Sequence, residues 1–553
     1  MGRYLVEPFD HSDRYATERY QGAEGRNWWR CDPTLRLLMR RRLGDGYAWA
    51  EPHLDRLGAL MGGLVARSAE ETDRNPPRLE KYDKWGRDVS QVVMPPSFHA
   101  ARDALMADNF TSPAFAEQAR AHAADPAALG AAWTYLLDQA DIGMGCALGT
   151  GGDMVVSLAE KHAPADVRDR VREIFANGFY SGEAAQMFTE RTGGSDLAAL
   201  ETAATPAGDA WLLTGLKWFA SNANGSAFVV LARLPEGAVA PFLVLWERRD
   251  GGRNGVRIRR LKDKLGTRSV ASAEVEFTSA EAFLLAGSGS GSGSGLGTMM
   301  KLTNASRLGV AMMGVGVARR ALVESICYAA AREAFGRPLI EQPLMRRKLG
   351  ELIVEVEAAQ AMVFDGHTGP RLRLGPALIK LRASRLGVTA ASDAIEVHGG
   401  NGYIEQWPVA RLLRDAQVNP IWEGGDNILC LDVRRAMEKE QAHLPFLAHL
   451  RTLATSDLVR TRIEDLAKAV EAWSSLDRAT AEARLYPLAQ FMADVYAAAL
   501  LEDQATWGLD DDRKALVARL YAERHLTDPG PLRGLDRPAT DPFDTLLAGA
   551  VTL

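Results

Sequence analysis

Between residues 185 and 286 the apolar pattern of this chain changes from helical spacing to short runs separated by turn residues. The runs cover residues 211–213, 228–232, 241–246, 256–258 and 273–277. Gly, Asn and Asp lie between them. Short apolar or alternating runs bounded by such residues predict β-strands, here an antiparallel unit of about a hundred residues. A helical protein with one inserted sheet is therefore the expected architecture.

Helices are predicted on both sides of this unit. Apolar residues recur at helical spacing in residues 35–39, 57–65 and 306–331. A chain of 553 residues exceeds the size at which one core keeps growing. We predict an α+β protein with an N-terminal helical domain, a central antiparallel β domain, a helical bundle domain and an extra C-terminal helical domain. The boundaries are 1–184, 185–286, 298–440 and 441–553, with the last long helical block ending near residue 528.

A run of alternating glycine and serine, residues 287–295, lies between the β domain and the next helix. Glycine loses much entropy on ordering and serine buries little surface, so residues 287–297 are predicted to form a flexible loop. The regularity of the run leaves open whether it is native or an engineered insert.

The composition is that of an ordinary globular protein, with 47% apolar and 25% charged residues. The net charge of -6 gives no support for general attraction to polyanions. No uninterrupted apolar run reaches the length that crosses a bilayer, and we expect no membrane attachment. Four well-separated cysteines predict a reduced, cytoplasmic protein without disulfides or a zinc cluster, namely Cys31, Cys146, Cys327 and Cys430.

The sequence Ile-Trp-Glu-Gly at residues 421–424 holds the strongest candidate for a catalytic group. Glu423 has an indole on one side and two glycines, Gly424 and Gly425, on the other. An apolar wall and an open backbone suit a general base that approaches its substrate closely. Taken alone, the pattern is also typical of an acid at the start of a helix.

Four further segments carry groups that suit a flat, phosphate-bearing cofactor. Residues 188–195 end in Gly-Gly-Ser, which exposes amides and a hydroxyl that can hold a phosphate or a ring edge. Residues 215–222 offer an aromatic wall with a small hydroxyl two positions later. Residues 331–337 bring an arginine, and 397–403 a glycine-rich turn. Each segment alone has an ordinary structural explanation.

In this order, the five segments resemble the flavin-dependent acyl-CoA dehydrogenase family over roughly residues 100–440. The resemblance implies an acyl-CoA dehydrogenase-like fold, an FAD cofactor, an acyl-CoA thioester substrate, a homotetramer and an electron-transfer acceptor. It implies that Glu423 removes the α-proton while the β-hydride passes to the flavin, and that Arg307 and Asn304 lie near the substrate. The cofactor-binding residues it implies are Phe188, Thr189, Ser195, Phe219, Ser221, Arg332, Phe335, Gln342, Val397, Gly399, Gly400, Gly425 and Asn427.

Some of these residues depart from the family pattern. Gln342 lies one place before the family's glutamine, and Phe219 and Ser221 stand where the family more often has Trp and Thr. The resemblance implies that Arg332 crosses a subunit interface to reach the FAD of a neighbouring chain. His398, in the glycine-rich turn, is expected to have a structural role.

Several segments are closest to the AidB branch of the family. They are residues 81–87, 260–268, 338–345, 422–432 and the C-terminal extension. Members of that branch resemble dehydrogenases at the active site but turn over acyl-CoA poorly, and they are linked to DNA binding through the C-terminal domain. The resemblance therefore leaves two functions open, an acyl-CoA dehydrogenase and a DNA-binding flavoprotein. An oxygen-using relative is a third, which the presence of Glu423 disfavours.

Charge distinguishes the first two functions. Residues 441–553 hold 12 Lys and Arg against 17 Asp and Glu. Duplex binding draws most of its affinity from clustered Lys and Arg, so an acidic extension disfavours DNA. A basic stripe on one face is the remaining route to DNA binding, and its candidates are Arg451, Arg460, Arg513, Lys514 and Arg519.

Overall fold

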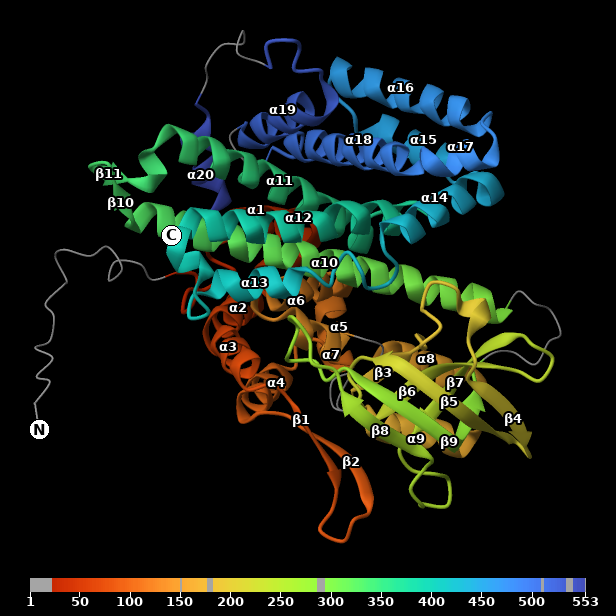
Figure 1. Ribbon diagram of the computed structural model, residues 1–553. Helices are drawn as coiled ribbons and strands as arrows, with labels where there is room; N and C mark the ends of the chain where they lie inside the picture. Colours follow the sequence, from red (N-terminus) through yellow and green to blue (C-terminus); the bar gives the residue numbers. More distant parts are fainter. Residues whose placement is uncertain are drawn as a thin grey trace, which may run out of the picture.

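A computed structural model describes residues 22–149, 152–176, 183–285, 294–508, 512–533 and 541–552. Figure 1 shows helices at the N-terminal end, a β domain beside them, a layer of long helices across the middle and a second helical layer above. This α+β arrangement is the predicted fold class.

The N-terminal domain is a group of helices with one hairpin inserted. Its helices are α1 Pro33–Leu43, α2 Tyr47–Leu60, α3 Ala66–Arg74, α4 Pro96–Asp108, α5 Pro113–Ala121, α6 Pro126–Ala140, α7 Ile142–Gly149, α8 Gly152–His162 and α9 Ala165–Ile174. Strands β1 Arg78–Tyr82 and β2 Asp88–Val93 form an antiparallel hairpin that projects from the body (Figure 1). The prediction of a mostly helical region missed this hairpin, which turns at Gly86 with φ 78°.

The β domain contains the five predicted strands and two more. The strands are β3 Ala184–Met187, β4 Ala203–Ala207, β5 Ala210–Ala220, β6 Ala227–Arg233, β7 Val239–Leu245, β8 Val256–Leu261 and β9 Ala273–Leu284. The prediction of an antiparallel unit needs one correction. β6 pairs in parallel with β3 and β4, so the sheet is mixed. A parallel pair needs a long crossover, which the chain between these strands supplies.

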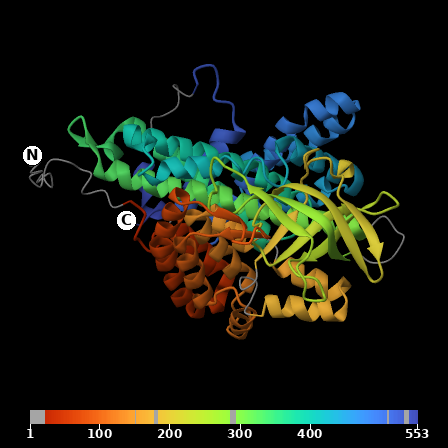
Figure 2. The same ribbon diagram turned by 60° about the horizontal axis from the view of Figure 1, so that its bottom comes forward.

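The sheet is covered on one side by helices that precede it in the sequence. Its order is β3-β6-β4-β5-β9-β7, with β8 on β9, and a further pairing of β6 with β7 curls it. Val155 of α8 and Val167 of α9 share a core with Val229 and Leu243 of the sheet. Figure 2 shows both helices beneath the strands.

The bundle domain follows, with α10 Ser294–Ala331, α11 Pro343–Thr368, α12 Gly375–His398, α13 Pro408–Ala416 and α14 Asp426–Glu440. A helix of 38 residues is about 57 Å long, so α10 spans the whole molecule (Figure 1). It begins at Ser294, inside the segment predicted as a loop, because an existing helix extends at little cost. The remainder of the predicted loop, residues 287–293, lies outside the described residues.

The C-terminal extension is helical, as predicted. It contains α15 His443–Leu453, α16 Asp457–Ser474, α17 Arg478–Ala483, α18 Leu485–Ala505, α19 Arg513–Leu526 and α20 Phe543–Ala550. The expectation that the helical block ends near residue 528 overlooked α20, which is only eight residues long and follows a stretch rich in Pro and Gly. Arg319 of α10 donates to the carbonyl of Ala550 at 2.7 Å, which fixes α20 against the bundle.

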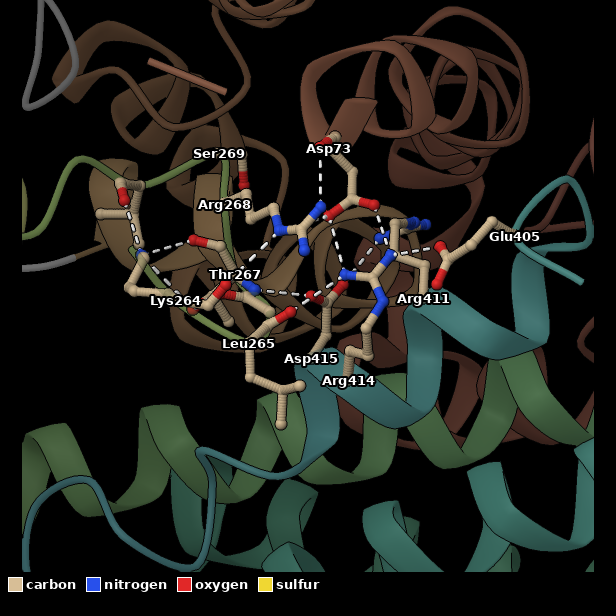
Figure 3. Close-up of polar contacts among 12 residues, drawn as sticks. Asp73, Lys264, Leu265, Thr267, Arg268, Ser269, Glu405, Arg411, Arg414 and Asp415 are labelled. Atoms are coloured by element: carbon tan, nitrogen blue, oxygen red, sulfur yellow. Dashed lines mark hydrogen bonds and ion pairs between the residues drawn. The ribbon is translucent and has the colours of Figure 1, made fainter. Parts of the chain in front are cut away.

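A polar network joins three parts of the chain and fixes the β domain against the helices (Figure 3). The loop between β8 and β9 donates from the Thr267 amide to Asp415 of α13 at 2.6 Å. Arg414 of α13 forms an ion pair with Asp73 of α3 at 2.5 Å. Arg411 closes the network on Asp415 at 2.9 Å. Because α13 leads directly into the segment that carries Glu423, this network also positions that segment.

By length and composition alone, the stretch Ile142–His162 could cross a membrane, but most of it is buried inside the protein. The same test is passed by core helices of soluble proteins. The four cysteines of the chain are buried, and the described residues contain no disulfide.

Candidate active site

Glu423 lies in the connection between α13 and α14, in a backbone conformation that side chains rarely adopt. Its φ is 54°, and Gly424 follows with φ 97°. A Cβ at Gly424 would meet Ile428 at 3.0 Å, so both φ and space favour glycine there. The positive φ values at these two residues direct the carbonyls of Glu423 and Gly424 towards the bundle, where cationic side chains donate hydrogen bonds to them.

Two buried cations hold this backbone. Arg307 of α10 donates from Nε to the carbonyl of Glu423 at 3.3 Å. Lys380 of α12 donates from Nζ to the carbonyl of Gly424 at 2.8 Å. The strained connection is therefore held through its backbone carbonyls, and neither contact engages the side chain of Glu423.

The carboxyl group of Glu423 is suited to act as a base near neutral pH. Its side chain is half-buried, and loss of hydration raises its pKa above the ordinary value for Glu, while the charges of Arg307 and Lys380 oppose that rise. Among the described residues, no group donates a hydrogen bond to the carboxylate, and the Glu423 amide donates to none of them. A base and a backbone donor are thus both available to an external molecule.

The predicted substrate-binding residues lie behind this segment. Arg307 is 3% exposed and its Nη1 donates to Asn304 at 3.1 Å and to Asp432 at 2.5 Å. Arg373 adds a second cation to Asp432 at 2.7 Å. Nε and Nη1 of Arg307 and Oδ1 of Asn304 are therefore engaged with the protein, an arrangement that positions the backbone of Glu423.

We expect Asp432→Asn to lower the free energy of unfolding by about 3 kcal/mol at pH 7, because the buried Arg307 and the half-buried Arg373 lose the carboxylate that they share. Burial opposes ionisation of Asp432, but Arg373 and Arg307 outweigh it and lower the pKa of this carboxyl. The stabilisation is therefore complete above the unfolded pKa of about 3.9 and is lost as the pH falls through the folded pKa. Urea unfolding at pH 7 and at about pH 2, where the carboxylate is protonated, measures this. Asp457→Asn, at a fully exposed acid, is the control, and an equal loss for Asp432→Asn at both pH values would contradict the assignment.

The β domain presents the second set of predicted residues. Phe219 of β5 is 53% exposed, although it is a large apolar ring. The amide of the adjacent Trp218 donates to the carbonyl of Thr189 at 2.9 Å, which aligns the segment containing Phe188 and Thr189 with β5. Ser221 lies 3.3 Å from Ser272, measured between the two hydroxyl oxygens. Aromatic rings and hydroxyls thus lie on adjacent segments, as a flat cofactor requires.

A buried ion pair, which no sequence pattern indicates, holds these segments together. Lys217 of β5 is fully buried and lies 2.6 Å from Glu190. Glu190 also accepts from the amide and hydroxyl of Thr202. Beyond it, Gly194 leaves room for Thr189, because a Cβ at Gly194 would lie 2.6 Å from the Thr189 hydroxyl. The exposed turn that carries Ser195 is thereby fixed beside Thr189.

The remaining predicted residues divide between two ends of the bundle. Gly425 and Asn427 adjoin Glu423, at the start of α14. Arg332 lies 25 residues beyond Arg307 along α10, which corresponds to about 37 Å. The residues near that far end of α10 include Phe335, Gln342, Val397, Gly399 and Gly400. A single chain therefore does not bring all the predicted cofactor residues together.

The far end of α10 forms an exposed tip. Strands β10 Glu333–Ala334 and β11 Arg337–Pro338 form a hairpin there, and Phe335 at its turn has φ 54° and is 96% exposed. Gln342 donates to the carbonyl of Ala334 at 3.0 Å and so stabilises the hairpin. Nearby, the imidazole of His398 is buried within 2.7 Å of the Ala394 carbonyl, as expected for a structural residue.

The residues present fit FAD. Phe219 exposes an aromatic face beside the Ser221 hydroxyl, and the turn at Gly193 and Gly194 offers an exposed backbone near Thr189. An aromatic ring system that carries a phosphate group can contact the aromatic face and hydroxyl with its ring and the exposed backbone turn with its phosphate. Sequence reasoning missed Lys380, Asp432 and the Glu190–Lys217 pair, because a charged residue in a helix or strand is ordinarily exposed and nothing in the local pattern marks it as buried.

A combination of helical and β domains with a half-buried carboxylate and an exposed aromatic ring fits a flavin oxidoreductase. Comparison with protein families identifies three domains: the acyl-CoA dehydrogenase C-terminal domain at residues 293–438, its middle domain at 185–280, and the N-terminal domain of the adaptive response protein AidB at 20–174. The chain belongs to the acyl-CoA dehydrogenase family, whose cofactor is FAD.

Individual relatives support the same assignment. The chain is 33% identical to AidB of Escherichia coli over 72% of its own length and 76% of that protein. It is 28% identical to acyl-CoA dehydrogenase family member 11 of Caenorhabditis elegans over 81% of its length and 76% of that protein. The crystal structure of Caenorhabditis elegans ACDH-11 in complex with C11-CoA matches 92% of this chain and 93% of that one, with a TM-score of 0.82 and 25% identity.

Proposed function

We propose that this protein is an FAD-dependent acyl-CoA dehydrogenase in which Glu423 removes the α-proton of an acyl-CoA thioester and an enoyl-CoA is released. The observation that carries this proposal is that the Glu423 carboxylate makes no hydrogen bond with the described residues, while two buried cations hold the backbone on which it lies. FAD, when bound, supplies the acceptor for the β-hydride. The raised pKa of Glu423 matches it to a weakly acidic C–H bond.

The backbone beside Glu423 supplies the second contribution. The Glu423 amide is free of partners among the described residues, and it is available to the thioester carbonyl. A donor at that oxygen stabilises the negative charge that develops as the α-proton leaves. Fixing Glu423 and its own amide in one rigid turn therefore positions base and donor together.

Mixing the holoenzyme anaerobically with acyl-CoA should bleach the oxidised flavin absorbance. The test is a panel of short, straight, branched and aromatic acyl-CoAs, followed by stopped-flow absorbance, with the acyl carboxylates lacking CoA as controls. Bleaching by at least one thioester and by none of the free acids is expected. Flavin that stays oxidised with the whole panel would contradict the dehydrogenase assignment.

We also propose that the active oligomer is a homotetramer, and that a neighbouring chain completes each cofactor site. The separation of about 37 Å between Arg307 and Arg332 along α10 supports this. So does the exposure of large apolar side chains near the far end of α10. They are Phe335, Leu344, Tyr403 and Ile404.

DNA binding through the C-terminal extension is not favoured by the geometry. Of the predicted stripe, Arg513 and Lys514 are 7% and 2% exposed and both contact Glu357, so neither is available to a phosphate. Arg451 pairs with Glu464 at 2.7 Å and Arg519 with Glu523 at 3.2 Å. The hypothesis of a continuous basic stripe is therefore wrong for its central residues.

We expect no salt-dependent binding of a 20-base-pair duplex at 0.15 M salt. Fluorescence anisotropy between 0.05 and 0.3 M salt measures it. A tight complex that weakens steeply with salt would show that phosphates are neutralised by a surface other than this one, and would restore the DNA-binding alternative.

A further inference from the structure

Lys380 of α12 is a fully buried lysine beside the segment that carries Glu423. Its side chain has no exposed surface, and its Nζ donates to the carbonyl of Gly424 at 2.8 Å. It forms no ion pair with a carboxylate anywhere in the described part of the chain. Burying an ammonium group whose contact is a backbone carbonyl lowers the stability of the fold, because the charge loses its hydration. We therefore ask which function this residue serves.

The charges around Lys380 come from three helices. Arg307 on α10 and Arg385 on α12 are cationic neighbours, while Glu423 and Asp426, at the start of α14, are the anionic ones. Asp426 is paired with Arg385 at 2.7 Å and Asp432 with Arg307 and Arg373, which leaves Glu423 as the acid without an ion-pair partner. Burial lowers the pKa of Lys380 to about 8, so the group is still mainly cationic at neutral pH.

Lys380 and Arg307 act on consecutive carbonyls. Arg307 donates to the carbonyl of Glu423, and Lys380 donates to the carbonyl of Gly424. These are the two residues whose φ values are 54° and 97°. Rotating either peptide group would break a charge-assisted hydrogen bond and would change the orientation of the Glu423 carboxylate. Of the two cations, Arg307 also forms an ion pair with Asp432, whereas Lys380 hydrogen-bonds, among the residues that the structure describes, only to this turn.

We propose that Lys380 is a positioning residue for Glu423, which fixes the turn that carries the base and keeps the carboxyl group ionised at neutral pH. This inference rests on the proposed function, because it concerns the same base. It assigns to a residue of α12, 43 positions from Glu423 in the sequence, a part in the proton transfer that no local motif indicates.

The test compares four variants with the wild type as FAD-loaded full chains. Lys380→Met removes the charge and the donor, Lys380→Gln keeps a donor but not the charge, and Lys380→Arg keeps both. Lys514→Met removes another buried lysine, which contacts Glu357 at 2.7 Å, and serves as the matched control. The limiting rate of anaerobic flavin reduction at saturating acyl-CoA is measured from pH 5.5 to 9, together with the concentration that gives half the limiting rate and the melting temperature.

For Lys380→Met we expect a limiting rate about tenfold lower at pH 7, with half-saturation changed less than twofold. The acid limb of its pH–rate profile, where the limiting rate falls as the base is protonated, should move about one pH unit upwards, because the Glu423 carboxyl loses a nearby cation. Lys380→Gln should show the same movement of the acid limb with a smaller loss of rate, and Lys380→Arg should keep the wild-type acid limb. Lys514→Met should leave both rate and profile unchanged. A purely structural lysine would instead lower the melting temperature and leave the pH profile in place.

An unchanged acid limb in Lys380→Met would overturn the inference. If that variant does not fold, Lys380→Gln is measured in its place and the same result decides. The proposed function is tested separately in the same experiment through Glu423→Gln. If Glu423→Gln is inactive while Lys380→Met behaves as wild type, only the role of Lys380 is lost. If Glu423→Gln reacts like the wild type, the assignment of the base itself fails.

Discussion

Glu423→Gln should lower the rate of anaerobic flavin reduction by about 10³- to 10⁴-fold, the contribution expected of a positioned general base. Gln has nearly the same shape as Glu but cannot accept the α-proton. The surrounding contacts of Arg307 and Lys380 are to backbone carbonyls, so they survive the substitution. The variant should therefore be folded and yellow, and should bind acyl-CoA.

Stopped-flow absorbance of the flavin, with a substrate that bleaches the wild type, measures this effect. Glu471→Gln, at an exposed acid on α16, is the control and should react at the wild-type rate. A perturbation of the flavin spectrum without bleaching would show that the substrate is bound but not deprotonated. Equal bleaching by Glu423→Gln and the wild type would remove Glu423 from the mechanism.

Arg332→Ala should weaken FAD binding by about 10- to 100-fold, since a guanidinium contact with a diphosphate contributes roughly 1.5–3 kcal/mol. Arg332 is exposed at the far end of α10, and it forms no ion pair within the described residues of its own chain. Its removal should therefore change cofactor content without lowering the melting temperature of the apoprotein. Arg337→Ala, at an exposed arginine of the same hairpin, is the matched control.

Mixed oligomers test whether Arg332 serves a neighbouring chain. Glu423→Gln chains contribute an intact Arg332, and Arg332→Ala chains contribute an intact Glu423. If each site combines Glu423 of one chain with Arg332 of another, then mixing the two inactive or weakened proteins should restore part of the activity, at limiting FAD. Activity no greater than the sum of the separate proteins would place both residues at a site within one chain.

The fold could be read from the sequence to a large extent because it depends on periodicity. Period-two runs bounded by Gly and Asp marked β5 to β9, and long helical spacing marked α10 to α12. The elements that were missed are short or need distant partners. Strand β3 and helix α20 gain stability from segments far away in the sequence, which local patterns do not report. The β1–β2 hairpin and β4 are short elements that pair with the neighbouring strand.

The sequence proposes residues for the candidate site, but it does not give their arrangement. Motifs indicated Glu423, Phe219 and Arg332, yet the sequence could not show that the bundle separates Arg332 from the other two. Nor could it show that Arg307 faces a backbone carbonyl and Asp432. Side-chain direction and the partner of a buried charge are set by tertiary packing, so residues such as Lys380 and Lys217 become visible only in the structure.

The most direct test is a crystal structure of the holoenzyme with an acyl-CoA analogue in which sulfur replaces the β-carbon, so that the carbonyl is kept but the acyl chain cannot be oxidised. We predict that a carboxylate oxygen of Glu423 lies within about 3.5 Å of the carbon next to the carbonyl, with the flavin ring on the opposite side of that carbon. A Glu423 side chain directed away from the ligand, or a flavin bound elsewhere than beside Phe219, would contradict the account.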